Sequence, residues 1–153
     1  MKKQSFKKVR EGDKRTFSKV ITEHDIEAFA AITGDFNPIH LDGNFAKRTI
    51  FRGKIAHGIL VGGLISAALT KFPGVIVYIS QTLDFLKPVR VGDKIEALAE
   101  VLEKIDKRSE LRLKTICKNQ WGETVVNGEA RIKILEVKDS GEESPRKEKT
   151  ETA

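Results

Sequence analysis

The feature that most constrains the fold of this chain is a helix pattern over residues 57–72 that has almost no polar face. A helix that is apolar all round must be buried on nearly all sides, so the remaining chain has to wrap around it. Gly62 and Gly63 lower its helix propensity, which indicates backbone packed tightly against a neighbour. The apolar positions of the pattern are Ile59, Leu60, Val61, Leu64, Ile65, Ala67, Ala68 and Leu69.

The residues that follow Pro73-Gly74 have the periodicity of β-strands. A first strand is expected earlier in the chain, over residues 14–20. Short turns separate the late strands, so these strands must pair antiparallel. The late strands predicted from β-branched, aromatic and alternating apolar residues are 75–86, 94–105, 111–117 and 126–134.

Five antiparallel strands and one apolar helix have a single sensible arrangement, in which the sheet curls around the helix. The predicted fold class is therefore α+β with a hot-dog architecture, formed by residues 1–137 as one domain. A chain of 153 residues is long enough for one substantial core. Residues 138–153 are charged and polar without periodicity, and they are predicted to form a disordered tail.

A candidate acid–base pair lies in the hexapeptide Asp35-Phe36-Asn37-Pro38-Ile39-His40, which is expected to be a loop. The hexapeptide follows a helix that begins with a Thr22–Asp25 capping box and ends at Gly34. The Asp35 carboxylate and the His40 imidazole can hold one water between them, with Asp35 as the proton acceptor. In the alternative interpretation, Asp35 forms an Asx-turn and His40 is a hydrogen-bonded, half-buried structural histidine.

The start of the apolar helix offers a complementary group. The first N–H groups of a helix lack intrahelical partners, and together with the helix dipole they suit a developing oxyanion. Gly58 has no side chain to block close approach, so its N–H is the candidate donor; a tight turn before the helix would equally explain the glycine. His57 is interpreted either as a polar residue at the helix start or as a catalytic one.

Two more polar residues have both a structural and a functional interpretation. Asn37 either caps the turn or fixes the water and His40. The Ser66 hydroxyl, in apolar surroundings, needs a partner. It bonds the carbonyl four residues back in its own helix, or it reaches Asp35 and orients the carboxylate. A lone hydroxyl in an otherwise apolar helix favours the second interpretation.

Composition excludes several other classes of function. The net charge of +6 comes from basic residues that are scattered among acids, and no recognisable nucleic-acid-binding motif accompanies them. A nucleic-acid partner is therefore not expected. No apolar run reaches the ~18 residues of a membrane span, and no apolar segment follows Met1-Lys2-Lys3 as in a secretory signal. The single Cys117, expected in the core, fits the cytoplasm. Neither metal nor cofactor is expected, because the histidines form no ligand set with cysteine and no phosphate loop is present.

Three separated motifs occur in register. They are Asp35 to His40 with Leu41, Asp42, Phe45 and Ala46; His57-Gly58-Ile59-Leu60 with Ser66; and Ser80 to Val89 with Val91-Gly92-Asp93. Together they resemble the MaoC-like, (R)-specific enoyl-CoA hydratase family, over roughly residues 8–136.

The resemblance implies a hot-dog homodimer that adds water reversibly to trans-2-enoyl thioesters and gives (R)-3-hydroxyacyl products. A small curled sheet also leaves exposed edge strands, which predicts a homodimer or a dimer of dimers. It implies that Asp35 and His40 are the catalytic dyad, that Gly58 supplies the oxyanion hole and that Ser66 supports Asp35. The substrate would be carried as a coenzyme A or acyl-carrier-protein thioester. Asp35 is expected to activate the water and His40 to protonate the α-carbon, although the sequence does not determine which residue makes which proton transfer.

Two alternatives stay open on the same fold. An acyl-CoA thioesterase would also use a helix N-terminus but would not need the Asp-Asn-Pro-His arrangement. In a non-catalytic acyl-CoA-binding protein the dyad would be idle.

Overall fold

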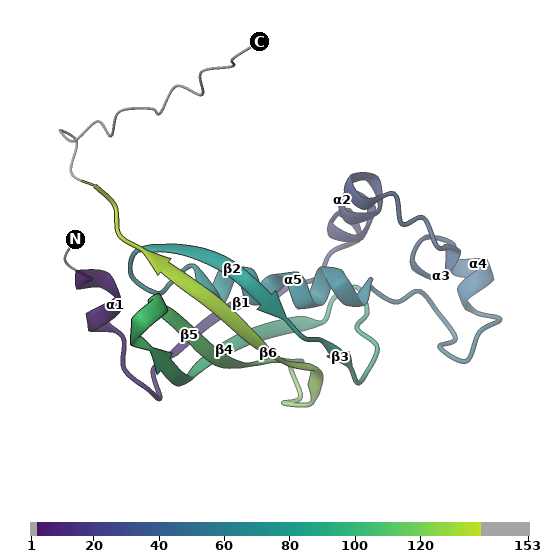
Figure 1. Ribbon diagram of the computed structural model, residues 1–153. Helices are drawn as coiled ribbons and strands as arrows, with labels where there is room; N and C mark the ends of the chain where they lie inside the picture. The colour runs from purple at the N-terminus through teal and green to yellow at the C-terminus, as the bar shows by residue number, and fades with distance from the viewer. Residues whose placement is uncertain (1–2, 139–153) are drawn as a thin grey trace, which may run out of the picture.

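The computed structural model describes residues 3–138, so the predicted tail lies outside the described residues except for Lys138. An antiparallel sheet curls around the central helix α5, which confirms the predicted hot-dog fold (Figure 1). The helices are α1 (Gln4–Lys8), α2 (Glu23–Thr33), α3 (Pro38–Leu41), α4 (Gly43–Ala46) and α5 (Gly58–Leu69), with a 3-10 turn at Asp106–Arg108. The strands are β1 (Lys14–Val20), β2 (Val75–Gln81), β3 (Asp84–Phe85), β4 (Lys94–Ile105), β5 (Glu110–Lys118) and β6 (Thr124–Leu135).

The strand order in the sheet is β1-β4-β5-β6-β2, and every pair is antiparallel. The predicted strand 75–86 is in fact two strands, because β2 ends at Gln81 and the short β3 pairs separately with β6. Between them the Thr82 carbonyl crosses β6 so closely that a Cβ on Gly128 would lie 1.8 Å from its oxygen. The chain can make this crossing only over a residue without a side chain.

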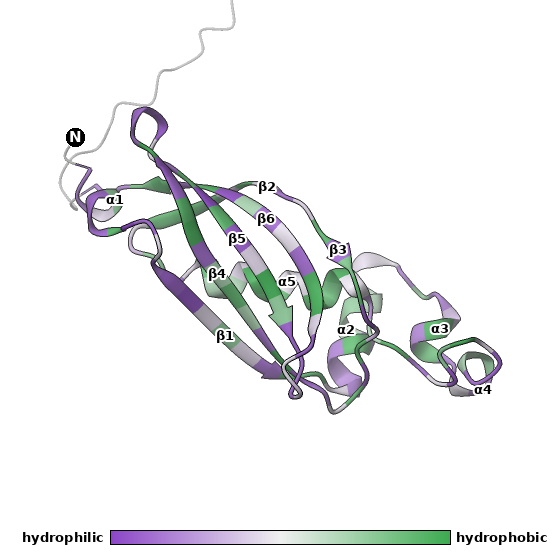
Figure 2. Ribbon diagram, turned by 90° about the horizontal axis from the view of Figure 1, so that it is seen from below, coloured by the Kyte–Doolittle hydropathy of each residue, from purple (hydrophilic) through white to green (hydrophobic). Residues whose placement is uncertain are grey.

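The core lies between the concave face of the sheet and α5. Along β4, Ile95, Ala97, Ala99 and Val101 are buried, as the alternating pattern predicted. Figure 2 shows hydrophobic residues along α5 and on the strands that surround it. Burying a side chain such as Ile65 stabilises the fold by about 1.5–3 kcal/mol relative to leaving it exposed.

Cys117 belongs to this core, as expected. Its Sγ lies on β5, fully buried, and the thiol donates to the Val61 carbonyl of α5 over 3.7 Å. Desolvation by burial raises the pKa of this thiol to about 12. Cys117 is therefore a protonated, packed side chain at neutral pH.

One stripe of α5 is not covered within the chain, which corrects the prediction of burial on nearly all sides. Ile59, Gly63, Ser66 and Thr70 are exposed, and their spacing places them on one helix face. Tight backbone packing occurs at Gly62, where a Cβ would lie 2.9 Å from Leu83 Cδ1. At Gly63 no atom lies within 4 Å of that position, so the prediction for this glycine is wrong within the chain.

Helix α1 was not foreseen, because one and a half turns are too short to show helical periodicity. Its Phe6 is buried, and the Glu136 carboxylate accepts from the N–H groups of Ser5 at 2.8 Å and Phe6 at 3.3 Å. The Ser5 side chain is the main cause that lowers the pKa of Glu136, and the backbone N–H groups of Phe6 and Ser5 lower it further. The carboxylate thus satisfies N–H groups at the helix start that have no intrahelical acceptor.

Helices α2 to α4 project beyond the end of the sheet (Figure 1). Helix α2 begins with the predicted capping box of Thr22 and Asp25 and ends at Gly34 in the left-handed region, with φ 79°. The hexapeptide expected to be a loop is partly helical: Pro38 opens the one-turn helix α3 after Asn37. Proline is favoured at the first helical position because its missing N–H would have no partner there.

Candidate active site

The structure brings Asp35 and His40 together at the junction of the projecting helices with α5. An Asp35 carboxylate oxygen, a nitrogen of His40 and a nitrogen of His57 all lie within 4.8 Å of one another. Two hydrogen bonds of about 2.8 Å that meet at one water span about 4.6 Å. The limit of 4.8 Å is therefore compatible with a single water held between Asp35 and His40.

His40 is held in a defined orientation on α3. Its side chain is 9% exposed, and its Nδ1 lies 2.8 Å from the Ile55 carbonyl oxygen. A carbonyl only accepts, so Nδ1 carries the proton, and in the neutral ring Nε2 is an acceptor. The hydrogen-bonded structural interpretation of His40 is thus correct in geometry, and it leaves the second ring nitrogen available for chemistry.

Asp35 also has a structural bond, in addition to its candidate role. One carboxylate oxygen accepts from the Asn37 N–H over 3.2 Å, which is the Asx-turn of the alternative interpretation. The other carboxylate oxygen makes no hydrogen bond with the described residues, and the side chain is exposed. Asn37 acts as the cap of α3, because its Oδ1 accepts from the Ile39 N–H over 3.3 Å.

Gly58 is the first residue of α5 and lines the same site. Within residues 3–138, no acceptor is bonded to the N–H groups of Gly58, Ile59 or Leu60. The Phe85 ring lies on the Gly58 Cα, so that a Cβ there would lie 2.6 Å from Phe85 Cδ1. Only glycine at this position allows the contact with Phe85 while its N–H stays free of an acceptor. Phe85 belongs to a motif of the sequence, but its place in the site was not predicted.

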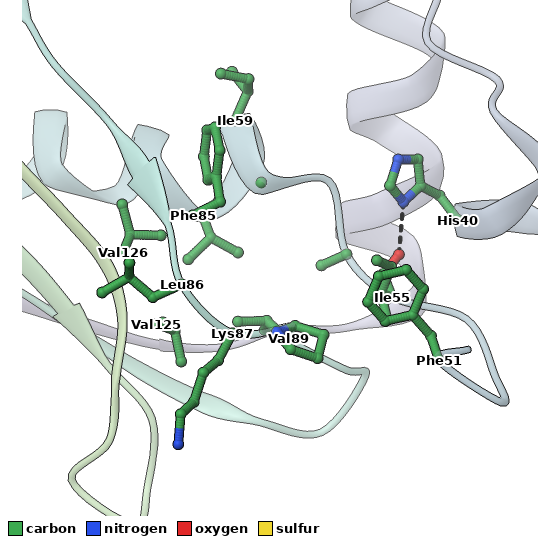
Figure 3. Close-up of a pocket in the computed structure, with 14 residues that line it drawn as sticks. His40, Phe51, Ile55, Ile59, Phe85, Leu86, Lys87, Val89, Val125 and Val126 are labelled. Carbon is green, nitrogen blue, oxygen red and sulfur yellow. Dashed lines mark hydrogen bonds between the residues drawn. The ribbon is translucent and has the colours of Figure 1, made fainter. Parts of the chain in front are cut away.

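His40 and Gly58 line one apolar pocket of about 380 Å³ (Figure 3). In Figure 3 the His40 ring lies at one side of this pocket and Val125 and Val126 lie at the other. Such a volume and lining suit a short apolar chain whose reactive end lies near His40. The residues that complete the lining are Phe51, Ile55, Ala56, Ile59, Val61, Phe85, Leu86, Lys87, Pro88 and Val89.

The Asp35, His40 and His57 group is a chemically reasonable donor set for a metal ion, so its geometry matters. The two rings are stacked, with centroids 3.9 Å apart and planes inclined by 31°. A metal ion binds an imidazole nitrogen in the plane of the ring, at about 2.0–2.1 Å for zinc. Two rings in such close face contact direct their nitrogens poorly at one common ion, so the three groups fit a hydrogen-bonded water better than a metal.

Ser66 does not meet Asp35 within the chain. It lies two turns along α5 from Gly58, about 12 Å at 1.5 Å per residue, and its side chain is exposed. The expectation of a buried hydroxyl that donates to Asp35 of the same chain is therefore wrong. The cause is that a helix sequence gives the axial position of a residue but not the distance to a separate segment.

This geometry changes the expected result for Ser66→Ala. Its kcat should stay within about twofold of wild type, because no bond to the Asp35 carboxylate of the same chain is lost. Steady-state kinetics and thermal unfolding of the variant test this. A tenfold or larger loss of kcat with unchanged unfolding would instead show that a Ser66 hydroxyl from another copy supports Asp35.

The sheet that curls around one helix defines a hot-dog protein, and the acid–base pair near the start of that helix defines its candidate active site. Residues 5–120 match the MaoC-like domain family, and the chain belongs to that family. It is 51% identical over 118 residues to a 3-hydroxybutyryl-CoA dehydratase of Methylorubrum extorquens, covering 76% of this chain and 74% of that protein. It is 37% identical to an (R)-specific enoyl-CoA hydratase of Rhodospirillum rubrum, covering 84% and 90% of the two chains.

The solved structures agree with these relatives. Unliganded R-hydratase PhaJ1 of Pseudomonas aeruginosa superimposes with a TM-score of 0.80 at 39% identity, covering 92% of this chain and 93% of that one. The (R)-hydratase of A. caviae involved in PHA biosynthesis gives a TM-score of 0.79 at 36% identity, with coverage of 83% and 98%. The resemblance drawn from the sequence motifs is thereby confirmed.

Proposed function

We propose that this protein is an (R)-specific enoyl-CoA hydratase, equally a 3-hydroxyacyl thioester dehydratase, which adds water reversibly to trans-2-enoyl thioesters. The observation that supports this activity most directly is the proximity of Asp35 to His40, together with an apolar pocket that His40 lines with Gly58. The N–H of Gly58 has no acceptor within the described residues. The relatives named as hydratases and dehydratases supply the substrate class. Asp35, His40 and Gly58 are the catalytic residues of this proposal.

The bonds of the site suggest how water is oriented. The Asp35 carboxylate and the His40 Nε2 both accept, so a water between them donates one hydrogen to each and directs its lone pair at the β-carbon. The thioester carbonyl accepts from the Gly58 N–H, which stabilises the enolate that forms as the oxygen–β-carbon bond forms. The dyad takes one proton from the water and returns a proton to the α-carbon, so hydration is balanced without a cofactor.

An assay with crotonyl-CoA separates the proposed hydratase from the two alternatives. We expect loss of the enoyl thioester absorbance, formation of (R)-3-hydroxybutyryl-CoA and no release of free thiol. A chelator should leave the rate unchanged, because no step uses a metal ion. Thiol release without hydration would identify a thioesterase, and binding without turnover would identify an acyl-CoA-binding protein.

The assembly we propose is a homodimer, or a dimer of dimers built from it. Strand β2 lies at one end of the strand order, so its outer edge is unpaired within the described chain. A groove of about 360 Å³ joins this strand to the exposed stripe of α5, lined by Ile59, Gly63, Tyr78 and Ile79 among others. Pairing β2 with β2 of a second copy would satisfy the edge N–H and C=O groups and cover the exposed stripe of α5.

Charges on exposed side chains of β2 should therefore prevent assembly. We expect the wild type to have a dimeric or larger mass at micromolar concentration, and the double variant Val77→Lys/Ile79→Lys to be monomeric. Both side chains are exposed in the single chain, at 39% and 41%. Ile32→Lys, on the projecting helix α2 and 83% exposed, is the matched control and should not change the mass.

Light scattering after size-exclusion chromatography measures these masses. A monomeric wild type would contradict the proposed dimer.

The proposed location is the cytoplasm, in keeping with a single, buried and unpaired cysteine. Within residues 3–138, no helix has both the length and the apolar character that crossing a bilayer requires.

A further inference from the structure

Of the clustered side chains Asp35, His40 and His57, His57 is the one that has no part in the proposed reaction. Only 2% of it is exposed, and its ring packs between Phe29 of α2 and His40 of α3, at centroid distances of 4.8 Å and 3.9 Å. It is also the residue directly before Gly58. One buried ring thus touches the helix that precedes Asp35, the helix that carries His40 and the start of α5.

Two contacts of His57 reach the dyad itself. Its Nε2 lies 3.0 Å from the backbone carbonyl oxygen of Asp35, so Nε2 carries the proton and donates. Its face lies against the face of His40, which is otherwise fixed by the bond from its own Nδ1 to Ile55. No other side chain described in residues 3–138 is bonded to the Asp35 carbonyl.

Packing alone does not explain a histidine at this place. The remaining nitrogen, Nδ1, is buried without a hydrogen-bond partner in the described residues. A buried polar atom without a partner destabilises a fold, and a phenylalanine would fill the same space without one. The residue must therefore contribute something that a purely apolar ring cannot. That contribution is the hydrogen bond from His57 Nε2 to the Asp35 carbonyl.

We propose that His57 is a positioning residue: it fixes Asp35 through the backbone and His40 through the ring face, and so sets their separation across the attacking water. The inference rests on the proposed hydratase function. Asp35 and His40 lie on a segment that projects beyond the sheet, whereas Gly58 lies on the central helix. His57 connects the two, and catalysis is sensitive to displacements on the order of 1 Å between such groups.

Two substitutions of His57 test the contribution of its N–H donor separately from the packing of its ring. His57→Phe keeps the ring between Phe29 and His40 but removes the donor, and we expect kcat to fall about 10–100-fold. KM should change by less than about threefold, because the pocket is untouched. The thermal unfolding midpoint should stay the same or rise, since the unpartnered Nδ1 is gone.

His57→Gln is the rescue variant, because its side-chain N–H can reach the Asp35 carbonyl. We expect its kcat to exceed that of His57→Phe, despite the loss of the ring. The matched control is His24→Gln on the exposed face of α2, which should keep wild-type kinetics. A merely structural role predicts the opposite: kcat unchanged per folded molecule and a lowered unfolding midpoint in both His57 variants. Wild-type kcat in His57→Phe, or a kcat for His57→Gln no higher than that of His57→Phe, would overturn the proposal.

A spectroscopic measurement tests the geometry independently of activity. The chain has three histidines, so selective ¹⁵N labelling gives a simple spectrum from which each ring tautomer can be determined. We expect the proton on Nδ1 in His40 and on Nε2 in His57. A proton on Nδ1 of neutral His57 would overturn the inference whether or not the protein hydrates crotonyl-CoA. An inactive wild type with the expected tautomers would instead overturn the proposed function and leave this placement of His57 supported.

Discussion

Asp35→Asn should fold normally and lose about 10²–10⁴-fold in kcat for hydration of crotonyl-CoA, the range typical of general acid–base catalysis. The amide keeps the oxygen that accepts from the Asn37 N–H, so the Asx-turn and the start of α3 are retained. What it removes is the carboxylate that orients and deprotonates the water. Initial rates and a thermal unfolding curve, recorded on the same preparation, measure the two quantities.

Asp42→Asn is the matched control for this experiment. Like Asp35, Asp42 accepts a hydrogen bond from a backbone N–H of the following turn: its carboxylate lies 3.1 Å from the Phe45 nitrogen at the start of α4. The change from Asp to Asn there should leave kcat unchanged. Near-normal turnover in Asp35→Asn would show that Asp35 is only a turn residue.

His40→Ala is expected to lose a similar factor. Because both residues act on one water, the double variant should be little worse than either single variant. A kcat of the double variant that is reduced by the product of the two single-variant losses would contradict a shared water.

The largest effect on stability is expected for Gly128→Ala. The new Cβ would lie 1.8 Å from the Thr82 oxygen and 2.8 Å from its carbonyl carbon, and both atoms are backbone. The segment between β2 and β3 must therefore shift, which breaks the bond from the Thr82 N–H to the Glu129 carbonyl at 2.9 Å. We expect a loss of at least about 3 kcal/mol in the free energy of unfolding, at or above the usual range for overpacking.

Urea unfolding measures this loss, with Gly43→Ala as the matched control. No atom lies within 4 Å of a Cβ at Gly43, and the residue lies in α4 without a positive φ. The control should be neutral or stabilising by up to about 1 kcal/mol. A Gly128→Ala protein with a wild-type midpoint would mean that the crossing is looser than described.

Local signals in the sequence predicted most of the fold. Strands β1 and β4 were predicted with the observed bounds, and the capping box of α2 forms as expected. These features depend on periodicity and on hydrogen bonds between near neighbours. The break between β2 and β3 was not predictable in this way, because it depends on how closely Thr82 approaches Gly128 across the sheet.

The candidate site could be predicted in part, for the same reason. The Asp35–His40 spacing is local, and so is the cap made by Asn37. The roles of His57 and Phe85 depend on contacts between segments that only the folded chain brings together. The prediction that Ser66 donates to Asp35 was wrong for a related reason. The position of Ser66 along α5 could be read from the sequence, but its distance from Asp35 could not.

The buried Cys117 has a consequence for a protein that handles enoyl thioesters. Such substrates are Michael acceptors, and their thioester bonds exchange with thiolates, so a reactive thiol beside the pocket would be alkylated or acylated by the substrate itself. The Cys117 sulfur bonds the carbonyl of Val61, a residue that lines the pocket, yet it is fully buried and its pKa is raised to about 12. The only thiol of the chain is thus kept protonated and out of reach, which protects the enzyme from inactivation by its own substrate.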